Sequence, residues 1–497
     1  MVLTGLILFP VVAALGIPFL KGDRTVRFYA LIVSLIEIIL AIPIITKFNP
    51  EGGFQFVEKS SWIPSMGLNY YLGIDGISVL MVLLTVFILP LTVLCSWTYI
   101  KKRTKEFHVA LLLTTAACIG LFSSLNLVLF YIFWEAILIP MYLIIAIWGG
   151  PRKKYASIKF FLYTLAGSVL LLLAIIAFYK SAGTFSIPEL MNHQFSMTFQ
   201  IFAFLAMAIA FAIKVPMFPF HTWLPAAHVE APTAGSVILA SILLKMGTYG
   251  FLRLCLPLTP KASMEFAPLI IILSIISIIY GGFIALGQTD VKKLIAYSSV
   301  AHMGFVTLGI FMFNTYGIEG AIIQMLNHGI TTGALFIMIG ALYERSHSRE
   351  IIDNMGLSKY LPVFIGFFLL FSLSSFGFPG TNSFIGEAMV LIGTFTKDVP
   401  TGLIVIPGAM LAAAYMLRLT LKLAWGEPSK AKGWKDLNLR EITMLIPLAF
   451  FVIYIGIAPK PFIKIIEPSV KTLIQQIDKN SGEKIIKTHN IRLGEKR

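Results

Sequence analysis

Four ionisable residues lie inside or beside long apolar runs, where a charged side chain is costly. Glu135 lies in "NLVLFYIFWEAILIPMYLII", Lys214 follows "IFAFLAMAIAFAI", Lys245 lies in "AGSVILASILLKMGTYGFL", and Glu387 ends "GFPGTNSFIGE". Ionisable groups at membrane depth usually mark the paths of ions or protons. Glutamate and lysine both gain and lose protons, whereas a buried arginine keeps its charge. We therefore interpret the four residues as groups of a proton path.

Glu135 is the expected partner of Lys214, because both fall in the same half of the chain. Burial disfavours the charged form of a lysine and a nearby carboxylate favours it. A lysine beside a glutamate can therefore bind and release a proton at ordinary pH, and the two titrations would be coupled. A purely structural ion pair between two helices remains an alternative for each of the four residues.

Histidines add groups that titrate near neutrality. The candidates for a secondary part of the path are His221, His228, His302 and His328. A single membrane histidine is often only a hydrogen-bonded packing residue, and that alternative stays open for His302 and His328. For His221 and His228, near the end of their span, a surface or capping role stays open. Asp290, Lys292 and Lys293 are expected to be charges at the membrane interface.

Two of the apolar runs are interrupted near these residues. Pro216 and Pro219 follow Lys214, and Pro379 with several glycines precedes Glu387. A break in a membrane helix frees backbone carbonyls, and it is tolerated where it lines a water-filled cavity. Broken helices at matching places in two halves of a chain are typical of inverted-repeat transporters.

The elements that position these residues are membrane helices. The chain has 497 residues, 57% of them hydrophobic and 13% charged, with a mean hydropathy of +0.86. About 20 residues cross a bilayer, and we expect an all-α polytopic fold of about fourteen spans. These are 2–20, 28–46, 75–97, 108–122, 126–148, 157–180, 198–229 (broken), 232–255, 267–287, 291–313, 320–343, 361–396 (broken), 401–424 and 441–459. The first is expected to be a retained helix.

The spans form two candidate inverted repeats of five helices, each with its break in the fourth helix. The predicted divisions are 1–107 (three N-terminal helices), 108–255 (first repeat), 256–424 (second repeat) and 425–497 (a last helix and a basic, polar tail from about Lys460). The prediction of repeats rests on topology, because the halves share no strong residue identity.

Basic residues gather in the loops after the odd-numbered spans. They are Lys21, Arg24, Arg27, Lys101, Lys102, Arg103, Lys105, Arg152, Lys153, Lys154, Lys292, Lys293, Arg345, Arg349, Lys359, Lys430, Lys432, Lys435 and Arg440. The positive-inside rule assigns these loops to the cytoplasm, so both termini are predicted on the outer side. The basic residues after Lys460 disagree with this assignment, but they lie far from a span.

Several function classes find no support. The net charge of +15 comes mostly from these loops and does not indicate nucleic acid binding. Cys95, Cys118 and Cys255 lie in apolar runs at no ligand spacing and are expected to be small buried residues. There is no CxxC, HExxH, phosphate-binding loop or dinucleotide fingerprint, so no metal or cofactor is expected in this chain.

Long motifs of the chain resemble those of the antiporter-like subunits of respiratory complex I. They are "KVPMFPFHTWLPAAHVEAPTAGSVILASILLKMGTYGFLR" (214–253), "GQTDVKKLIAYSSVAHMGFV" (287–306), "GFPGTNSFIGE" (377–387) and "GIDGIS" (73–78). The resemblance runs nearly to residue 460. In that family an intramembrane glutamate, two lysines and a terminal ionisable residue carry protons, which implies roles for Glu135, Lys214, Lys245 and Glu387. One subunit type has a glutamate at the last place where the other two usually have lysine, as here.

The resemblance implies a membrane-arm subunit of an NADH:quinone oxidoreductase in a bacterial-type inner membrane. Protons would enter near Lys214, pass Lys245 and the histidines, and leave near Glu387, driven by quinone reduction elsewhere. NADH, FMN, Fe–S clusters and quinone would belong to partner subunits, and other antiporter-like subunits would flank the chain. The alternatives are a subunit of a multi-subunit sodium/proton antiporter, a subunit of a membrane-bound hydrogenase-type complex, or a scaffold between pumping neighbours.

Overall fold

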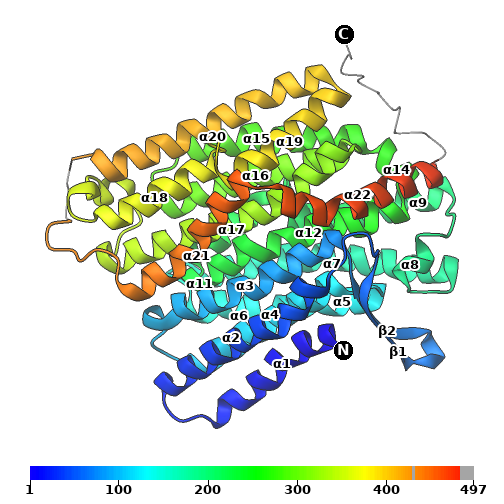
Figure 1. Cartoon of the computed structure of the whole chain (residues 1–497), viewed down its shortest axis with the longest axis horizontal. Helices are drawn as coiled ribbons and strands as arrows, with labels where there is room; N and C mark the ends of the chain where they lie inside the picture. Colours follow the sequence, from blue (N-terminus) through cyan, green and yellow to red (C-terminus); the bar gives the residue numbers. More distant parts are fainter. Residues whose placement is uncertain (428–430, 482–497) are drawn as a thin grey trace.

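The computed structural model describes residues 1–427 and 431–481 and is an all-α membrane fold, as predicted (Figure 1). Thirteen helical stretches of this part of the chain are long and apolar enough to cross a membrane. They are α1 with η1 (Val2–Phe19), α2 (Asp23–Lys47), α3 (Gly76–Tyr99), α4 (Thr104–Ser123), α5 and α6 (Leu127–Ala136, Leu138–Trp148), α7 (Lys153–Ala182), α9 (Met197–Lys214), α11 to α13 (Thr233–Leu258), α15 (Ala267–Leu286), α16 (Val291–Phe311), α17 (Thr315–Ser346), α20 (Val399–Trp425) and α21 (Leu439–Ile457).

Both predicted breaks are present. The first lies between α9 and α10 (Trp223–Glu230), and the second lies between α18 (Pro362–Ser375) and α19 (Asn382–Lys397). α18 and α19 are each too short to cross a bilayer singly, and together they occupy the predicted broken span 361–396. The count rises to fourteen when α18 and the bent segment before it, Ile351–Lys359, are taken as one span. Short helices α8 (Ile187–Leu190) and α14 (Pro260–Glu265) lie in the connections.

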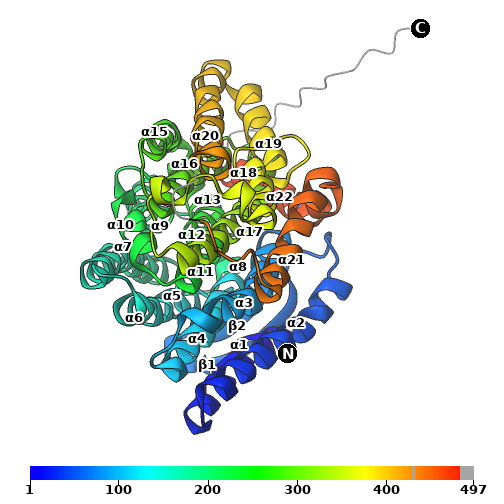
Figure 2. The ribbon, with the colours of Figure 1, turned by 90° about the vertical axis from the view of Figure 1, so that its left-hand side faces the viewer.

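The basic loops meet at one end of the helices, which we call the basic face (left in Figure 1, toward the viewer in Figure 2). Contacts between loops define it: Arg27 donates to the Ile100 carbonyl, and Arg345 donates to the Lys435 carbonyl. A small cavity there is lined by residues that include Tyr99, Gly150, Lys292 and Arg349. The predicted clustering of basic loops on one face is therefore present in the fold.

The opposite end, which we call the hairpin face, carries strands that the sequence did not predict. β1 (Gln55–Ile63) and β2 (Leu68–Ile74) form an antiparallel hairpin after α2. Glu58 of β1 accepts hydrogen bonds from the backbone N–H groups of Leu3 (2.9 Å) and Thr4 (3.1 Å). The hairpin therefore satisfies free N–H groups at the start of α1, as a helix N-cap does.

The predicted tail from Lys460 is wrong over the described residues, because Lys460–Ser481 forms helix α22. Its buried residues are Ile466, Val470, Leu473, Ile474 and Ile477, the spacing of one apolar helix face. This face packs against α3, α13, α14 and α17 on the hairpin face. The charged residues of α22 lie on its other face, so polar composition hid the amphipathic pattern. Residues 482–497 lie outside the described part.

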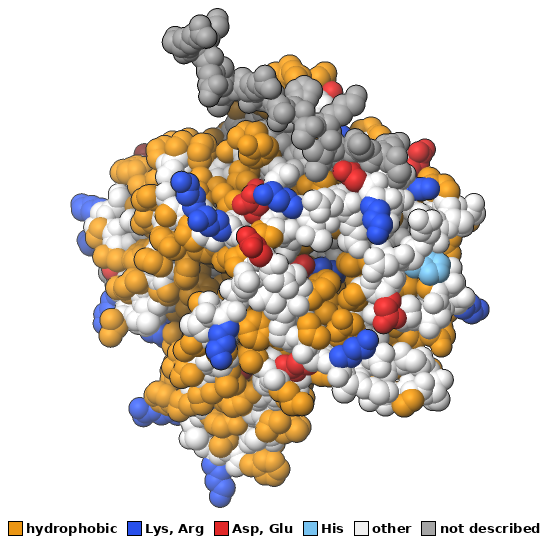
Figure 3. All heavy atoms as spheres, turned by 45° about the vertical axis from the view of Figure 1, so that its right-hand side comes forward, with side chains coloured by type: hydrophobic (Ala, Val, Ile, Leu, Met, Phe, Trp, Pro, Cys, Tyr) orange, Lys and Arg blue, Asp and Glu red, His pale blue; other side chains and the backbone are white. Residues whose placement is uncertain are grey.

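Three spans are buried inside the protein. The most apolar windows of Thr233–Leu258 and Thr315–Ser346 are 100% buried, and that of Val291–Phe311 is 94% buried, whereas those of α7 and α20 are 39% buried. Hydrophobic side chains cover broad areas of the surface, with charged groups among polar atoms (Figure 3). The three buried spans therefore form a core that can hold charged groups away from lipid.

Similar pairs of backbone bonds occur in the two halves of the chain. Leu127 N–H donates to the Phe185 carbonyl and Ile187 N–H to the Leu125 carbonyl, both at 2.9 Å. Val291 N–H donates to the Arg349 carbonyl (2.9 Å) and Ile351 N–H to the Thr289 carbonyl (2.8 Å). The same exchange thus occurs at the start of α5 on the hairpin face and of α16 on the basic face.

Candidate functional site

Lys245 lies at the centre of the buried core, just after an irregular helical turn. Residues Leu239–Leu243 form a π-helix within the span, and Lys245 is fully buried. π-Helical turns often occur at functional sites. The Lys245 ammonium donates to Nδ1 of His328 at 2.7 Å and also to the carbonyl of Ala240. The π-helical turn thus supplies a backbone carbonyl, that of Ala240, as the acceptor for the buried Lys245 ammonium.

His328 continues a line of polar groups from Lys245 across α17, α16 and α19. The His328 and His302 rings have centroids 5.9 Å apart. His302 Nδ1 lies 2.8 Å from Oε1 of Glu387. All four residues are at most 5% exposed. The structure therefore brings four of the eight candidate residues into one buried line, which we call the central line (Lys245, His328, His302, Glu387).

Two residues that sequence reasoning missed also bond to the central line. Gln324 Nε2 donates to Oε1 of Glu387 at 3.0 Å, and the Tyr415 hydroxyl lies 3.3 Å from Nε2 of His302. Gln324 lies four residues before His328 on α17, so helical spacing was a usable signal for it. Nothing in the sequence around Tyr415 separates it from other membrane tyrosines.

The break between α18 and α19 positions the Glu387 carboxylate. Gly377 lies in this break with φ of +71°, a backbone conformation that favours glycine. A Cβ atom added to Gly377 would lie 3.0 Å from Oε2 of Glu387. The glycine therefore allows both the turn and the close approach of the carboxylate.

We expect Gly377→Ala to lower proton translocation several-fold, because the new methyl group would displace the Glu387 carboxylate. The matched control is Gly380→Ala: Gly380 has φ of +91°, but no atom lies within 4 Å of an added Cβ. Both changes place a side chain on a residue with positive φ, which costs about 1–2 kcal/mol. Proton uptake by assembled complexes in vesicles measures the difference, and equal losses in both variants would show that backbone strain alone is responsible.

Lys214 is the last residue of α9 and is 2% exposed. Its ammonium lies 5.1 Å from the centre of the Trp134 ring and 5.9 Å from that of Phe160. Aromatic faces stabilise a cation at such distances. Lys214 is not part of the central line. Among the described residues, its ammonium lies against these two rings.

Glu135 and Lys214 do not form the expected ion pair in this conformation. No ion pair within 4.0 Å joins them in the part of the chain that the structure describes, although they are close enough to interact electrostatically. Glu135 is half-buried, and its Oε1 has no hydrogen-bond partner among the described residues. The ring of Trp134, the residue before Glu135, lies against the Lys214 ammonium instead.

His228 is fully buried and stacks on Phe336, with ring centroids 4.6 Å apart. Neither of its ring nitrogens has a hydrogen-bond partner among the described residues. His221 lies in the α9–α10 break and stacks against Phe218 and Tyr280. Thus neither His228 nor His221 makes a hydrogen bond or ring contact with the central line among the described residues.

Lys292, which we expected to be a charge at the membrane interface, is largely buried. It is 8% exposed, and its ammonium donates to the Ala231 carbonyl at 2.7 Å. Nearby, buried Glu230 accepts a hydrogen bond from the Arg152 N–H at 2.9 Å. A cavity of about 220 Å³ on the basic face has Arg152, Glu230 and Lys293 in its lining. This cavity has room for water beside the ends of α10 and α16 on the basic face.

Metal chemistry finds no site among the described residues, because no group of three or more His, Cys, Asp or Glu side chains is placed to hold an ion. Cys95, Cys118 and Cys255 are buried and free. The arrangement is therefore one of buried lysine, histidine and glutamate groups, whose chemistry is proton binding and release.

Comparisons with known proteins agree with this chemistry. Residues 124–412 match the family described as "NADH:quinone oxidoreductase/Mrp antiporter, TM", and residues 7–132 match "NADH-ubiquinone oxidoreductase chain 4, amino terminus". NADH-quinone oxidoreductase subunit M of Rickettsia prowazekii is 46% identical over 459 residues, covering 91% of this chain and 94% of that one.

Two solved structures are similar in fold. A chain of respiratory complex I from Thermus thermophilus with bound NADH superposes with a TM-score of 0.89 at 29% identity, covering 96% of this chain and 100% of that one. A chain of the Mrp complex from Dietzia sp. superposes with a TM-score of 0.83 at 19% identity, covering 96% of this chain and 55% of that one. At that identity the second likeness concerns the fold alone.

Proposed function

Because the chain belongs to the NADH-quinone oxidoreductase subunit M family, we propose that the central line is the route by which it translocates protons. The chain is a proton-translocating membrane-arm subunit of an NADH:quinone oxidoreductase. The observation that carries the assignment of residues is the buried line from Lys245 through His328 and His302 to Glu387. A structural scaffold has no reason to bear the desolvation cost of these groups.

In this proposal the four residues exchange protons in sequence. Lys245 holds a proton between His328 and the Ala240 carbonyl. His328 can accept it only when Nδ1, now paired with the ammonium, becomes the protonated nitrogen. The 5.9 Å ring spacing leaves His302 as the next acceptor, reached through a water molecule or a ring movement. His302 then protonates Glu387, and Gln324 and Tyr415 hold these two side chains in place.

Lys214 and Glu135 form the first stage of the same route. Lys214 is held against Trp134 and lies beside the α9–α10 break, where backbone carbonyls can accept water. We propose that Glu135 approaches Lys214 in another conformation of the complex. Approach of the carboxylate would hold the lysine proton, and its withdrawal would release the proton toward Lys245. The absence of an ion pair here corresponds to the withdrawn state.

The proposed orientation places the basic face in the cytoplasm and the hairpin face outside, in a bacterial-type inner membrane. Protons then enter by the cavity at Arg152 and Glu230 and leave beyond Glu387. Other membrane-arm subunits, including other antiporter-like subunits, would flank the chain. NADH, FMN, Fe–S clusters and quinone would bind in partner subunits, which supply the redox energy.

Sealed membrane vesicles test the proposal, with NADH-driven quinone reduction and proton uptake followed together in sodium-free buffer. We expect wild type to take up protons and Lys214→Ala to lose most of this uptake while the complex still assembles. Exposed Lys154 provides the matched control, and Lys154→Ala is expected to behave as wild type.

The main alternative, a sodium/proton antiporter subunit, predicts a different result in the same vesicles. A sodium gradient would then drive proton movement, and NADH would drive none in wild type. A hydrogenase-type complex would instead respond to hydrogenase substrates. Full proton uptake in assembled Lys214→Ala complexes would remove Lys214 from the route without changing the family assignment.

A further inference from the structure

The buried span that carries Lys245 ends on the hairpin face in a second irregular turn. Residues Phe251–Cys255 form a π-helix, and Arg253 within it is 3% exposed. The Arg253 guanidinium donates to Oδ1 of Asp75 at 2.5 Å, and its Nε donates to the Tyr249 hydroxyl at 3.1 Å. Tyr249 lies four residues from Lys245, so Lys245, Tyr249 and Arg253 follow one side of the span.

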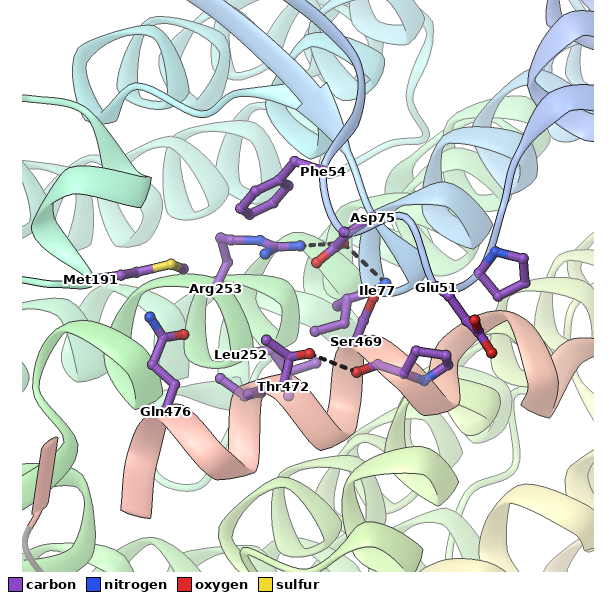
Figure 4. Close-up of a pocket in the computed structure, with 14 residues that line it drawn as sticks. Glu51, Phe54, Asp75, Ile77, Met191, Leu252, Arg253, Ser469, Thr472 and Gln476 are labelled. Carbon is purple, nitrogen blue, oxygen red and sulfur yellow. Dashed lines mark hydrogen bonds and ion pairs between the residues drawn. The ribbon is translucent and has the colours of Figure 1, made fainter. Parts of the chain in front are cut away.

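A cavity of about 170 Å³ reaches Arg253 from the hairpin face (Figure 4). Its walls include Phe54, Asp75 and Arg253 on one side and Ser469, Thr472 and Gln476 of α22 on the other. A buried water molecule needs about 10–15 Å³ of such volume and two to four polar partners. The cavity therefore has room for several water molecules in contact with the guanidinium.

Water in this cavity would lie a short way from the proton route. Arg253 is eight residues from Lys245, about 12 Å along a helix. Tyr249 lies between them in the sequence, and its hydroxyl contacts Arg253. A chain of hydrogen-bonded groups from the cavity to Lys245 would let protons leak to the outside without passing Glu387. Such a leak would uncouple translocation from quinone reduction.

We propose that Arg253 is the seal that prevents this leak. A guanidinium has five donors and no acceptor, and it is not deprotonated in proteins. Arg253 donates on one side to Asp75 and on the other to Tyr249, so it can neither accept a proton from the cavity nor pass one on. The Tyr249 hydroxyl donates to the Phe122 carbonyl at 2.9 Å, which directs its proton away from the cavity. A buried arginine excludes protons from water pores in a comparable way.

Asp75 holds the seal in place. It is the N-cap of α3, where its carboxylate accepts the N–H groups of Ile77 and Ser78, each at 3.1 Å. The same Oδ1 atom accepts the guanidinium. Because α3 and the Lys245 span meet at this carboxylate, the arginine is fixed at the inner wall of the cavity. The Phe54 ring lies over the guanidinium, and its centre is 5.1 Å from Cζ of Arg253.

The proposal rests on the proton route of the preceding section, but its test uses passive proton flow and no redox drive. Purified complexes are reconstituted in liposomes, a potassium diffusion potential is imposed with valinomycin, and proton entry is followed with an internal pH dye. Removing Arg253 alone would leave a buried, unpaired carboxylate, which is strongly destabilising. The informative variant is therefore Asp75→Asn/Arg253→Gln, which keeps a good helix cap and replaces the donor-only group by one that also accepts.

We expect passive proton flow to rise several-fold in Asp75→Asn/Arg253→Gln. It is expected to stay at the wild-type level in Thr472→Val, which changes the opposite wall of the cavity and keeps the Asp75–Arg253 pair. Adding Lys245→Met to the double variant is expected to remove the leak. An assembled double variant that is as tight as wild type would overturn the proposal, and so would a leak that persists with Lys245→Met. Should the double variant not assemble, Arg253→Lys serves: lysine can release its proton, so a leak supports the seal and a tight membrane refutes it.

Failure of this test is distinguishable from failure of the proposed function. If a complex pumps with NADH but shows no leak in either Arg253 variant, the proposed proton route stands and only the role of Arg253 as a seal is refuted. A complex that responds to a sodium gradient instead of NADH still reports passive flow through Lys245.

Discussion

Replacing Lys245 by methionine is expected to lower proton translocation by about a hundredfold, the scale of loss when a positioned proton-transfer group is removed. Lys245 is the only residue of the central line that donates to Nδ1 of His328. Methionine has a similar length, so the core stays filled, but the line then begins at a histidine with no proton supply. NADH-driven proton uptake in vesicles, normalised to assembled complex, measures the effect.

Two further variants separate proton transfer from a structural role for Lys245. Lys397→Met is the matched control, because Lys397 is also held by a backbone carbonyl, that of Phe311, at the hairpin end of α19. It is expected to pump as wild type. Lys245→Arg keeps a fixed charge that cannot release its proton, so it is expected to be as inactive as methionine. An active Lys245→Arg complex would favour the purely structural ion-pair interpretation.

The membrane fold followed directly from the sequence, because hydropathy is a property of each segment alone. The candidate residues were found for the same reason: Lys245 and Glu387 are exceptions to an apolar rule that holds around them. The breaks at Pro216 and Pro379 were equally visible, because several prolines or glycines occur close together there and each weakens a helix. Single prolines such as Pro90 and Pro407 lie inside continuous helices. These signals required no knowledge of which helices are neighbours.

Other features depend on distant contacts and left no local signal. The contact of His302 with Glu387 joins residues 85 positions apart, and that of Tyr415 with His302 joins residues 113 apart. Helix α22 has a mean composition that is polar, and only its spacing of apolar residues predicts burial. The π-helical turn before Lys245, Leu239–Leu243, contains no proline or glycine that would mark it in the sequence.

The relation of Glu135 to Lys214 shows a different limit. Both residues were identified, but a sequence does not determine side-chain distances, and the carboxylate remains outside ion-pair range. The ring of Trp134 lies over the ammonium instead. A pair that must open and close is expected to be found apart in some conformations, so its distance in one of them does not decide its role.

Exchanging Glu387 and Gln324 is the second change for which we expect a large effect. Glu387→Gln alone keeps the side-chain shape and its hydrogen bonds but removes the last titratable group of the central line. We expect it to lower NADH-driven proton uptake by about a hundredfold in a complex that still assembles. His302 would then have no acceptor for its proton.

The double variant Glu387→Gln/Gln324→Glu restores a carboxylate on the facing helix. The two side chains are 3.0 Å apart in the present structure, and both are at most 5% exposed. The new carboxylate would therefore lie close to the original position, but on α17 instead of α19. We expect the double variant to recover a measurable part of the proton uptake that Glu387→Gln loses. Gln324→Glu alone would place two carboxylates side by side, and its proton uptake is expected to fall below that of wild type. No recovery in an assembled double variant would mean that the position of the carboxylate on α19, beside Gly377, matters as much as its ability to hold a proton.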